Sequence, residues 1–95
     1  MNTIETMLPV VAAVQCAKGA LSFIAEVDED MAVAIVKDLT EAVKAKDGAE
    51  ALRICAAVID EAEVIGEMTG VCVKDVAASS REFVAAQTAA FNEVS

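Results

Sequence analysis

The apolar side chains of this chain are abundant and almost all small, and this combination restricts the fold more than any other feature. Apolar residue types make up 57% of the 95 residues, yet only three residues are aromatic, all of them phenylalanine. Alanine and valine recur in runs such as residues 10–14. Alanine favours helix, and the distance between packed helices depends on the size of the side chains between them. The composition therefore predicts closely packed helices.

Capping residues and the near absence of strand signals divide the first half of the chain into two expected helices. The first is expected over residues 7–25, with Thr6 as its N-cap and Pro9 in the first turn, where a missing N–H costs little. The second is expected over residues 29–45, with Asp28 as its N-cap.

A third helix is expected to follow Asp47. Asp47 and Glu50 have the spacing of a capping box, and the helix should end near Gly66 or Gly70. The linker between the second and third helices is very short, so these two helices should form an antiparallel hairpin.

The start of the fourth helix is left open by the sequence. It either extends over residues 71–94 or begins afresh near Ser80, because residues 79–82 offer another capping box. The fold class is therefore predicted to be all-α: one domain, residues 1–95, forming a compact bundle of about four helices.

The first and fourth helices are the expected contact surfaces. The first is apolar nearly all round, which is typical of a helix that is central in its fold or shared between chains. The apolar content also exceeds the 45–50% typical of soluble domains, which favours burial against a second chain and hence a homo-oligomer. The predicted protein-interface residues are Ala13, Cys16, Ala20, Phe23, Phe83 and Phe91.

The residue types that most enzymes use are missing. The chain has no histidine, which removes Ser-His and Cys-His nucleophile pairs and every histidine-containing zinc site. No glycine-rich phosphate loop occurs. The three cysteines, Cys16, Cys55 and Cys72, form no metal spacing and lie in apolar surroundings, as expected in a reducing compartment. We therefore expect a cytoplasmic protein that is not an enzyme and carries no catalytic residue, cofactor or metal.

The charge balance restricts the partners. Sixteen acidic and seven basic residues give a net charge of −9, which disfavours direct binding to nucleic acid or to an anionic membrane. Residues 7–25 are long enough to span a bilayer, but Gln15, Lys18 and Ser22 interrupt them, so no membrane span is expected. The expected partner is a protein.

Two functions from different classes follow. The first is a non-catalytic interaction or assembly protein that self-associates through helix–helix contacts. The alternative is a small acidic inhibitor or nucleic-acid mimic that binds a basic partner through Asp60, Glu63 and Glu67, which share one helix face. The same spacing arises on any solvated helix, and a carboxylate-only metal site is a third reading of these residues.

Overall fold

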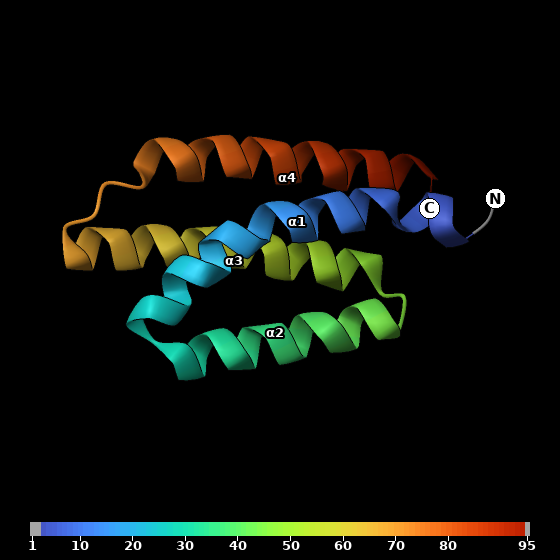
Figure 1. Ribbon diagram of the computed structural model, residues 1–95. Helices are drawn as coiled ribbons and strands as arrows, with labels where there is room; N and C mark the ends of the chain where they lie inside the picture. The colour runs from blue at the N-terminus through green and yellow to red at the C-terminus, as the bar shows by residue number, and fades with distance from the viewer. Residues whose placement is uncertain (1–2, 95) are drawn as a thin grey trace.

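Residues 3–94 are described by the computed structural model, and they form four helices and no strand (Figure 1). The predicted all-α bundle is therefore confirmed. The helices are α1 (Thr3–Val27), α2 (Glu29–Lys44), α3 (Gly48–Thr69) and α4 (Lys74–Val94).

A central pair of helices, α1 and α3, organises the bundle. Each of the two contacts all three other helices, whereas α2 and α4 do not contact each other within the described residues. In Figure 1, α2 and α4 accordingly lie on opposite sides of the central pair. The bundle is flattened, with extents of 45 × 25 × 14 Å. Each outer helix therefore covers only one side of the central pair.

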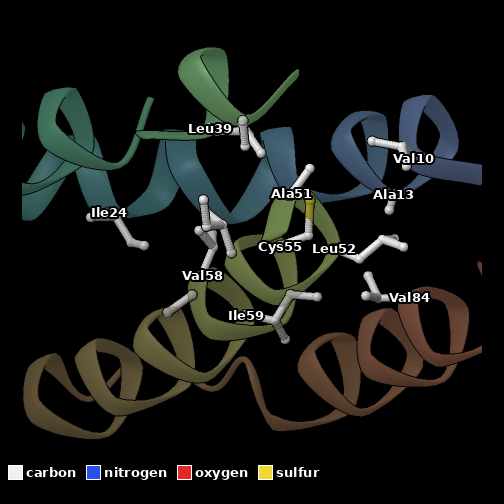
Figure 2. Close-up of a cluster of buried hydrophobic side chains, with 14 of the residues drawn as sticks. Val10, Ala13, Ile24, Leu39, Ala51, Leu52, Cys55, Val58, Ile59 and Val84 are labelled. Carbon is white, nitrogen blue, oxygen red and sulfur yellow. The ribbon is translucent and has the colours of Figure 1, made fainter. Parts of the chain in front are cut away.

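The core is built mainly from α3. Figure 2 shows side chains of all four helices meeting in one apolar cluster around it. No polar or charged side chain among the described residues is buried. The helical spacing of six apolar residues in the sequence predicts an inward stripe on this helix, and every member is buried: Leu52, Cys55, Val58, Ile59, Ala62 and Ile65.

Helix α1 differs from its prediction at both ends. It begins at Thr3, so Thr6 lies inside the helix, and Pro9 is in the second turn. Proline removes one N–H donor and restricts the residue before it, but the helical backbone continues through this position. At the other end α1 continues to Val27, and its last turn is closed by the N–H of Asp28, which donates to Ile24 O at 2.7 Å.

The connection between α1 and α2 is a single residue, Asp28. Its side chain accepts a hydrogen bond from the N–H of Met31 at 3.1 Å, as an N-cap does. Glu29 and Asp30 then place negative charge in the first turn, where the helix dipole favours it. The predicted N-cap of α2 is therefore confirmed.

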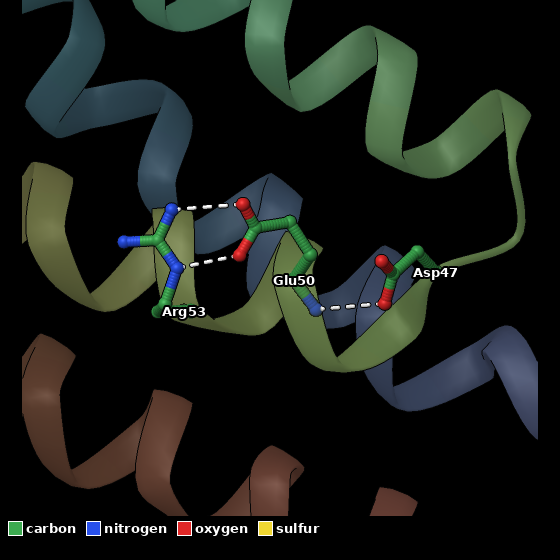
Figure 3. Close-up of polar contacts among 3 residues, drawn as sticks. All are labelled: Asp47, Glu50 and Arg53. Carbon is green, nitrogen blue, oxygen red and sulfur yellow. Dashed lines mark hydrogen bonds and ion pairs between the residues drawn. The ribbon is translucent and has the colours of Figure 1, made fainter.

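The connection between α2 and α3 shows half of the predicted capping box (Figure 3). Asp47 Oδ1 accepts the N–H of Glu50 at 3.1 Å. The Glu50 carboxylate does not reach back, since it binds Arg53 through two hydrogen bonds of 2.5 and 2.9 Å, and these lower the pKa of Glu50. The N–H of Asp47 donates instead to Ala42 O at 2.9 Å. The N-cap contact of Asp47 is therefore present without the reciprocal contact of Glu50, and α2 and α3 form the expected hairpin.

The fourth helix begins at Lys74, between the two starts that the sequence left open. Helix α3 ends at Gly70, whose φ of 78° is left-handed and therefore suits glycine. The N–H groups of Gly70 and Val71 both reach Gly66 O. Residues 79–82 lie inside α4, so the second predicted capping box does not start a helix.

Candidate protein-binding groove

An open apolar groove follows the line between α1 and α2. It consists of three adjoining hollows of about 380, 360 and 360 Å³. The middle hollow shares Val14 and Val43 with the first, and Leu21 and Val36 with the third, so the three are continuous. We call this surface the α1–α2 groove.

Both walls of the groove follow a heptad pattern, in which steps of four and three residues alternate. The α1 wall includes Met7, Val11, Val14, Lys18, Leu21 and Ala25. The α2 wall includes Glu29, Val33, Val36, Thr40 and Val43. This spacing keeps one stripe of a helix facing a partner helix along its length. The groove therefore has the side-chain arrangement of a surface on which another helix packs.

The apolar side chains along the groove remain in contact with solvent. Val33 is 61% exposed, Leu8 is 56% exposed and Val36 is 47% exposed. No other described helix covers them, because α3 and α4 pack on the remaining sides of α1. Contiguous exposed apolar surface of this kind marks interaction sites on soluble proteins.

The two ends of the groove carry opposite charges. Lys46 lines the hollow beside the first turns of α1, Lys44 lines the middle hollow, and Glu29 lines the hollow beside the last turns of α1. Lys18 lies between them. None of these four forms an ion pair within the described residues, whereas both arginines of the chain do. Three of the seven basic residues of a strongly acidic chain are therefore gathered, unpaired, in this groove.

The predicted interface residues of α1 lie on another side of that helix. Ala13 is fully buried in the core of the single chain. Cys16, Ala20 and Phe23 are half-buried and line a smaller hollow, of about 180 Å³, where α1 meets α3 and the start of α4. The small side chains of Cys16 and Ala20 thus lie against helices of the same chain.

The predicted interface residues of α4 are separated by the fold. Phe91 belongs to the buried core, as does Val84, which lies seven residues earlier. Phe83 directly precedes Val84, so it points away from the core face that holds Val84 and Phe91, and it is 41% exposed. At 3.6 residues per turn, Val84 and Phe91 are offset by only about 20° around the helix, whereas Phe83 and Phe91 are offset by about 80°. Of this pair, only Phe83 remains accessible to a partner.

Sequence reasoning missed the α2 wall of the groove. The sequence spacing of Ala32, Ile35, Leu39, Ala42 and Val43 predicts one inward stripe on α2; Ala32, Leu39 and Ala42 are buried, whereas Val43 is exposed at the groove. The missed signal was a second stripe beside the first, with Val33, Val36 and Val43 in heptad positions. One helix can carry both stripes because its apolar residues cover a broad face opposite Lys37, Asp38 and Glu41.

The acidic residues singled out in the sequence are partly neutralised by α4. Arg81 donates from Nε to Asp60 Oδ1 at 2.7 Å and from Nη2 to Glu63 Oε1, and the two carboxylates raise the pKa of Arg81. The contact joins α3 to α4. Glu67 forms no ion pair and lines a hollow beside residues 70–74. The predicted acidic face is therefore interrupted by a cation.

Cys16, Cys55 and Cys72 are free, and burial raises the pKa of the Cys55 thiol to about 11, so this thiol is neutral and unreactive near pH 7. Within residues 3–94, no group of three His, Cys, Asp or Glu side chains is arranged to hold a metal ion.

One segment of α1 meets the length and composition of a membrane span. It is Thr6–Val27, with a mean hydropathy of 1.6. The same segment supplies Val10, Ala13, Ala17 and Ile24 to the core. A core helix of a globular bundle and a signal sequence satisfy the same criterion, and 22% of the apolar window is buried in the bundle.

Comparison of the chain with models of protein families, with curated proteins and with solved structures finds no match. The fold and the groove by themselves define a class of protein: a small acidic helical bundle with an open apolar groove along one pair of its helices.

Proposed function

We propose that this protein is a non-catalytic interaction protein that assembles with another protein chain through helix–helix contacts. Its contact surface is the α1–α2 groove, and the occupant is an amphipathic helix or helix pair with heptad-spaced apolar residues. The observation that carries the proposal is the pair of heptad-spaced walls, on which Val11, Val33, Val36 and Val43 are 39–61% exposed. Helices with anchors at such spacing bind in apolar grooves of this kind.

The chemistry of the groove supports binding over catalysis. Its polar lining consists of the amide of Gln15, the hydroxyls of Ser22 and Thr40, three lysines and one glutamate. Histidine is absent from the chain, and the groove holds no cysteine or pair of carboxylates that would serve as nucleophile or acid–base pair.

The acidic-inhibitor alternative has weaker support. It requires Asp60, Glu63 and Glu67 to offer their charge to a basic partner. Arg81 engages two of these three carboxylates, so a partner would have to displace it or act mainly through Glu67. The groove presents its apolar side chains without any such competitor, which is why we favour it as the contact surface.

A crosslinking experiment with a matched control tests the proposed function. Val36 in the groove and Val64 on α3 are the same residue type with nearly equal exposure, 47% and 48%. A benzoylphenylalanine photo-crosslinker is placed at either position, and the full chain is irradiated in an extract of the cells that express it. We expect adducts from position 36 that map to partner segments with heptad apolar spacing, and far fewer from position 64.

Two results would contradict the proposal. One is equal crosslinking from the two positions, and the other is an adduct from position 36 that maps only to non-helical segments. Circular dichroism of both variants verifies that the bundle is retained.

A further inference from the structure

We infer that the occupant of the α1–α2 groove is a second copy of this chain, related to the first by a two-fold axis that crosses the groove. In this dimer the two α2 helices run antiparallel, and Glu29 of each copy faces the Lys44–Lys46 end of the other. The inference rests on the proposed function of the groove and adds the identity and the orientation of the partner.

The charges of the groove make it complementary to its own reversed copy. Lys44 and Lys46 lie toward one end and Glu29 at the other, and none of them has an ion-pair partner within the described residues. When two copies meet with reversed directions, each lysine end lies over a glutamate end. Both charge pairs of the dimer are then attractive, and such complementarity fixes the register of an interface.

Symmetry leaves two ways to place one groove on another about a two-fold axis in the interface. If the axis runs along the groove, equal ends meet, so that lysines face lysines and Glu29 faces Glu29. If the axis crosses the groove, opposite ends meet. Like charges placed opposite each other disfavour the first arrangement, and the second follows.

The apolar wall positions support the same orientation. Reversal of α2 about the midpoint between Val33 and Val43 places these two valines opposite each other and Val36 opposite Thr40. It also brings Asp30, the neighbour of Glu29, opposite Lys46, and Glu29 opposite Asp47. Apolar side chains thus meet apolar or hydroxyl side chains through the middle of α2, with the charges at its ends, as in an antiparallel pair of heptad helices.

The α1 wall reverses in the same way. About its midpoint, Val11 comes opposite Leu21, and Lys18 comes opposite Val14. A lysine opposite a valine can lay its methylene stem on the apolar surface and keep its ammonium group in water. The second copy therefore covers both walls of the groove without burying an unpaired charge.

A lipid surface fits the groove less well than a second copy does. The chain has a net charge of −9, and anionic leaflets attract basic residues. The groove also carries Glu29 at one end, and inserting α1 into a bilayer would remove Val10, Ala13 and Ile24 from the core.

Sedimentation equilibrium of the full chain tests the identity of the partner. Between about 1 and 500 μM, the wild-type protein should show a reversible monomer–dimer equilibrium. Val36→Glu should weaken dimerisation by about 100-fold or more, because it places a charge in the interface. Val64→Glu is the matched control and should leave the equilibrium within about twofold of wild type.

Charge reversal tests the orientation. One variant is Glu29→Lys, and the other is Lys44→Glu with Lys46→Glu. Each alone should weaken its homodimer by about tenfold at low salt, since every charge pair becomes repulsive. An equimolar mixture of the two variants should regain dimerisation, because all pairs in the heterodimer are again opposite in sign. Lys46 has a φ of 57°, and glutamate there keeps the same backbone strain.

A loss of folding stability in either variant would persist in the mixture. Regained dimerisation in the mixture therefore reports on the charge pairs and not on folding. If Lys44→Glu with Lys46→Glu instead dimerises better with wild type than wild type does with itself, the axis runs along the groove and the inferred orientation is overturned.

A wild-type chain that stays monomeric over the whole concentration range overturns the second copy as partner. If that monomer binds phosphatidylcholine vesicles with or without phosphatidylserine, and Val36→Glu abolishes the binding, the groove faces a membrane. The crosslinking comparison of positions 36 and 64 decides separately whether the groove binds a protein helix, so failure of self-association and failure of the proposed function give different results.

Discussion

Replacing Gly48 by alanine tests whether this glycine is required for close packing of three helices. Gly48 is the first residue of α3 and is buried. A Cβ atom at this position would lie 2.3 and 2.4 Å from two ring carbons of Phe91 on α4, and 3.1 Å from Val10 Cγ2 on α1. Carbon atoms in favourable contact are about 3.5–4.0 Å apart, so the ring would have to move by roughly 1 Å.

The expected loss of stability is the difference between two opposing effects. Overfilling a packed core costs about 1–3 kcal/mol. Alanine in place of glycine restricts the unfolded chain, which contributes about 0.5–1 kcal/mol in the opposite direction. We therefore expect Gly48→Ala to lower the free energy of unfolding by about 0.5–2 kcal/mol, or about 4–8 °C in Tm for each kcal/mol.

Gly19 provides the matched control, because a Cβ there meets no atom within 4 Å and the residue is exposed on α1. Gly19→Ala should stabilise the protein by about 0.5–1 kcal/mol. Urea and thermal unfolding followed by circular dichroism measure both changes. In a double-mutant cycle, Phe91→Leu should make Gly48→Ala less harmful, since the shorter side chain makes room for the methyl group. If Gly48→Ala stabilises as much as Gly19→Ala, the close approach of the helices at Gly48 does not exist.

Two further predictions concern the cap of α3 and the buried thiol. Asp47→Ala should lower the free energy of unfolding by about 1 kcal/mol in urea titrations, because the N–H of Glu50 loses its acceptor; no change would mean that water replaces the carboxylate fully. Because the pKa of Cys55 rises from 9.0 to about 11 on folding, the native state keeps this proton longer than the unfolded chain. Stability should therefore be constant with respect to this group below about pH 9 and fall between pH 9 and about 11, and Cys55→Ala should remove that part of the pH dependence. If the free energy of unfolding depends on pH in the same way for the wild type and Cys55→Ala, the raised pKa of Cys55 is refuted.

The local structure of this chain was largely predictable because it depends on neighbours in the sequence. Asp28 and Asp47 act as N-caps in the structure as the sequence indicated, since a short carboxylate before a helix can reach the N–H three residues later. The end of α3 at Gly70 has the same local origin. The stripe on α3 was also readable, because its polar residues alternate clearly with its apolar ones.

The errors fall where a local rule competes with contacts elsewhere in the fold. Glu50 has the spacing to complete a capping box, but Arg53 on the next turn binds its carboxylate. Residues 79–82 have the same spacing, yet Arg81 is directed to Asp60 and Glu63 on α3, and the helix runs through. Sequence spacing identifies a candidate contact, and the choice among candidates depends on which partner lies closest in space.

The sequence by itself determined that this chain forms packed helices with small apolar side chains and without histidine. Those side chains cover α1 on nearly all sides, so periodicity could not show which side would be buried. Only the tertiary structure decided this: α3 and α4 cover one part of α1, whereas α2 packs beside it and leaves Leu8, Val11, Val33 and Val36 exposed. The physical reason is that burial depends on how many neighbours surround a helix, and in a flattened four-helix bundle the central α1 still keeps one apolar side open.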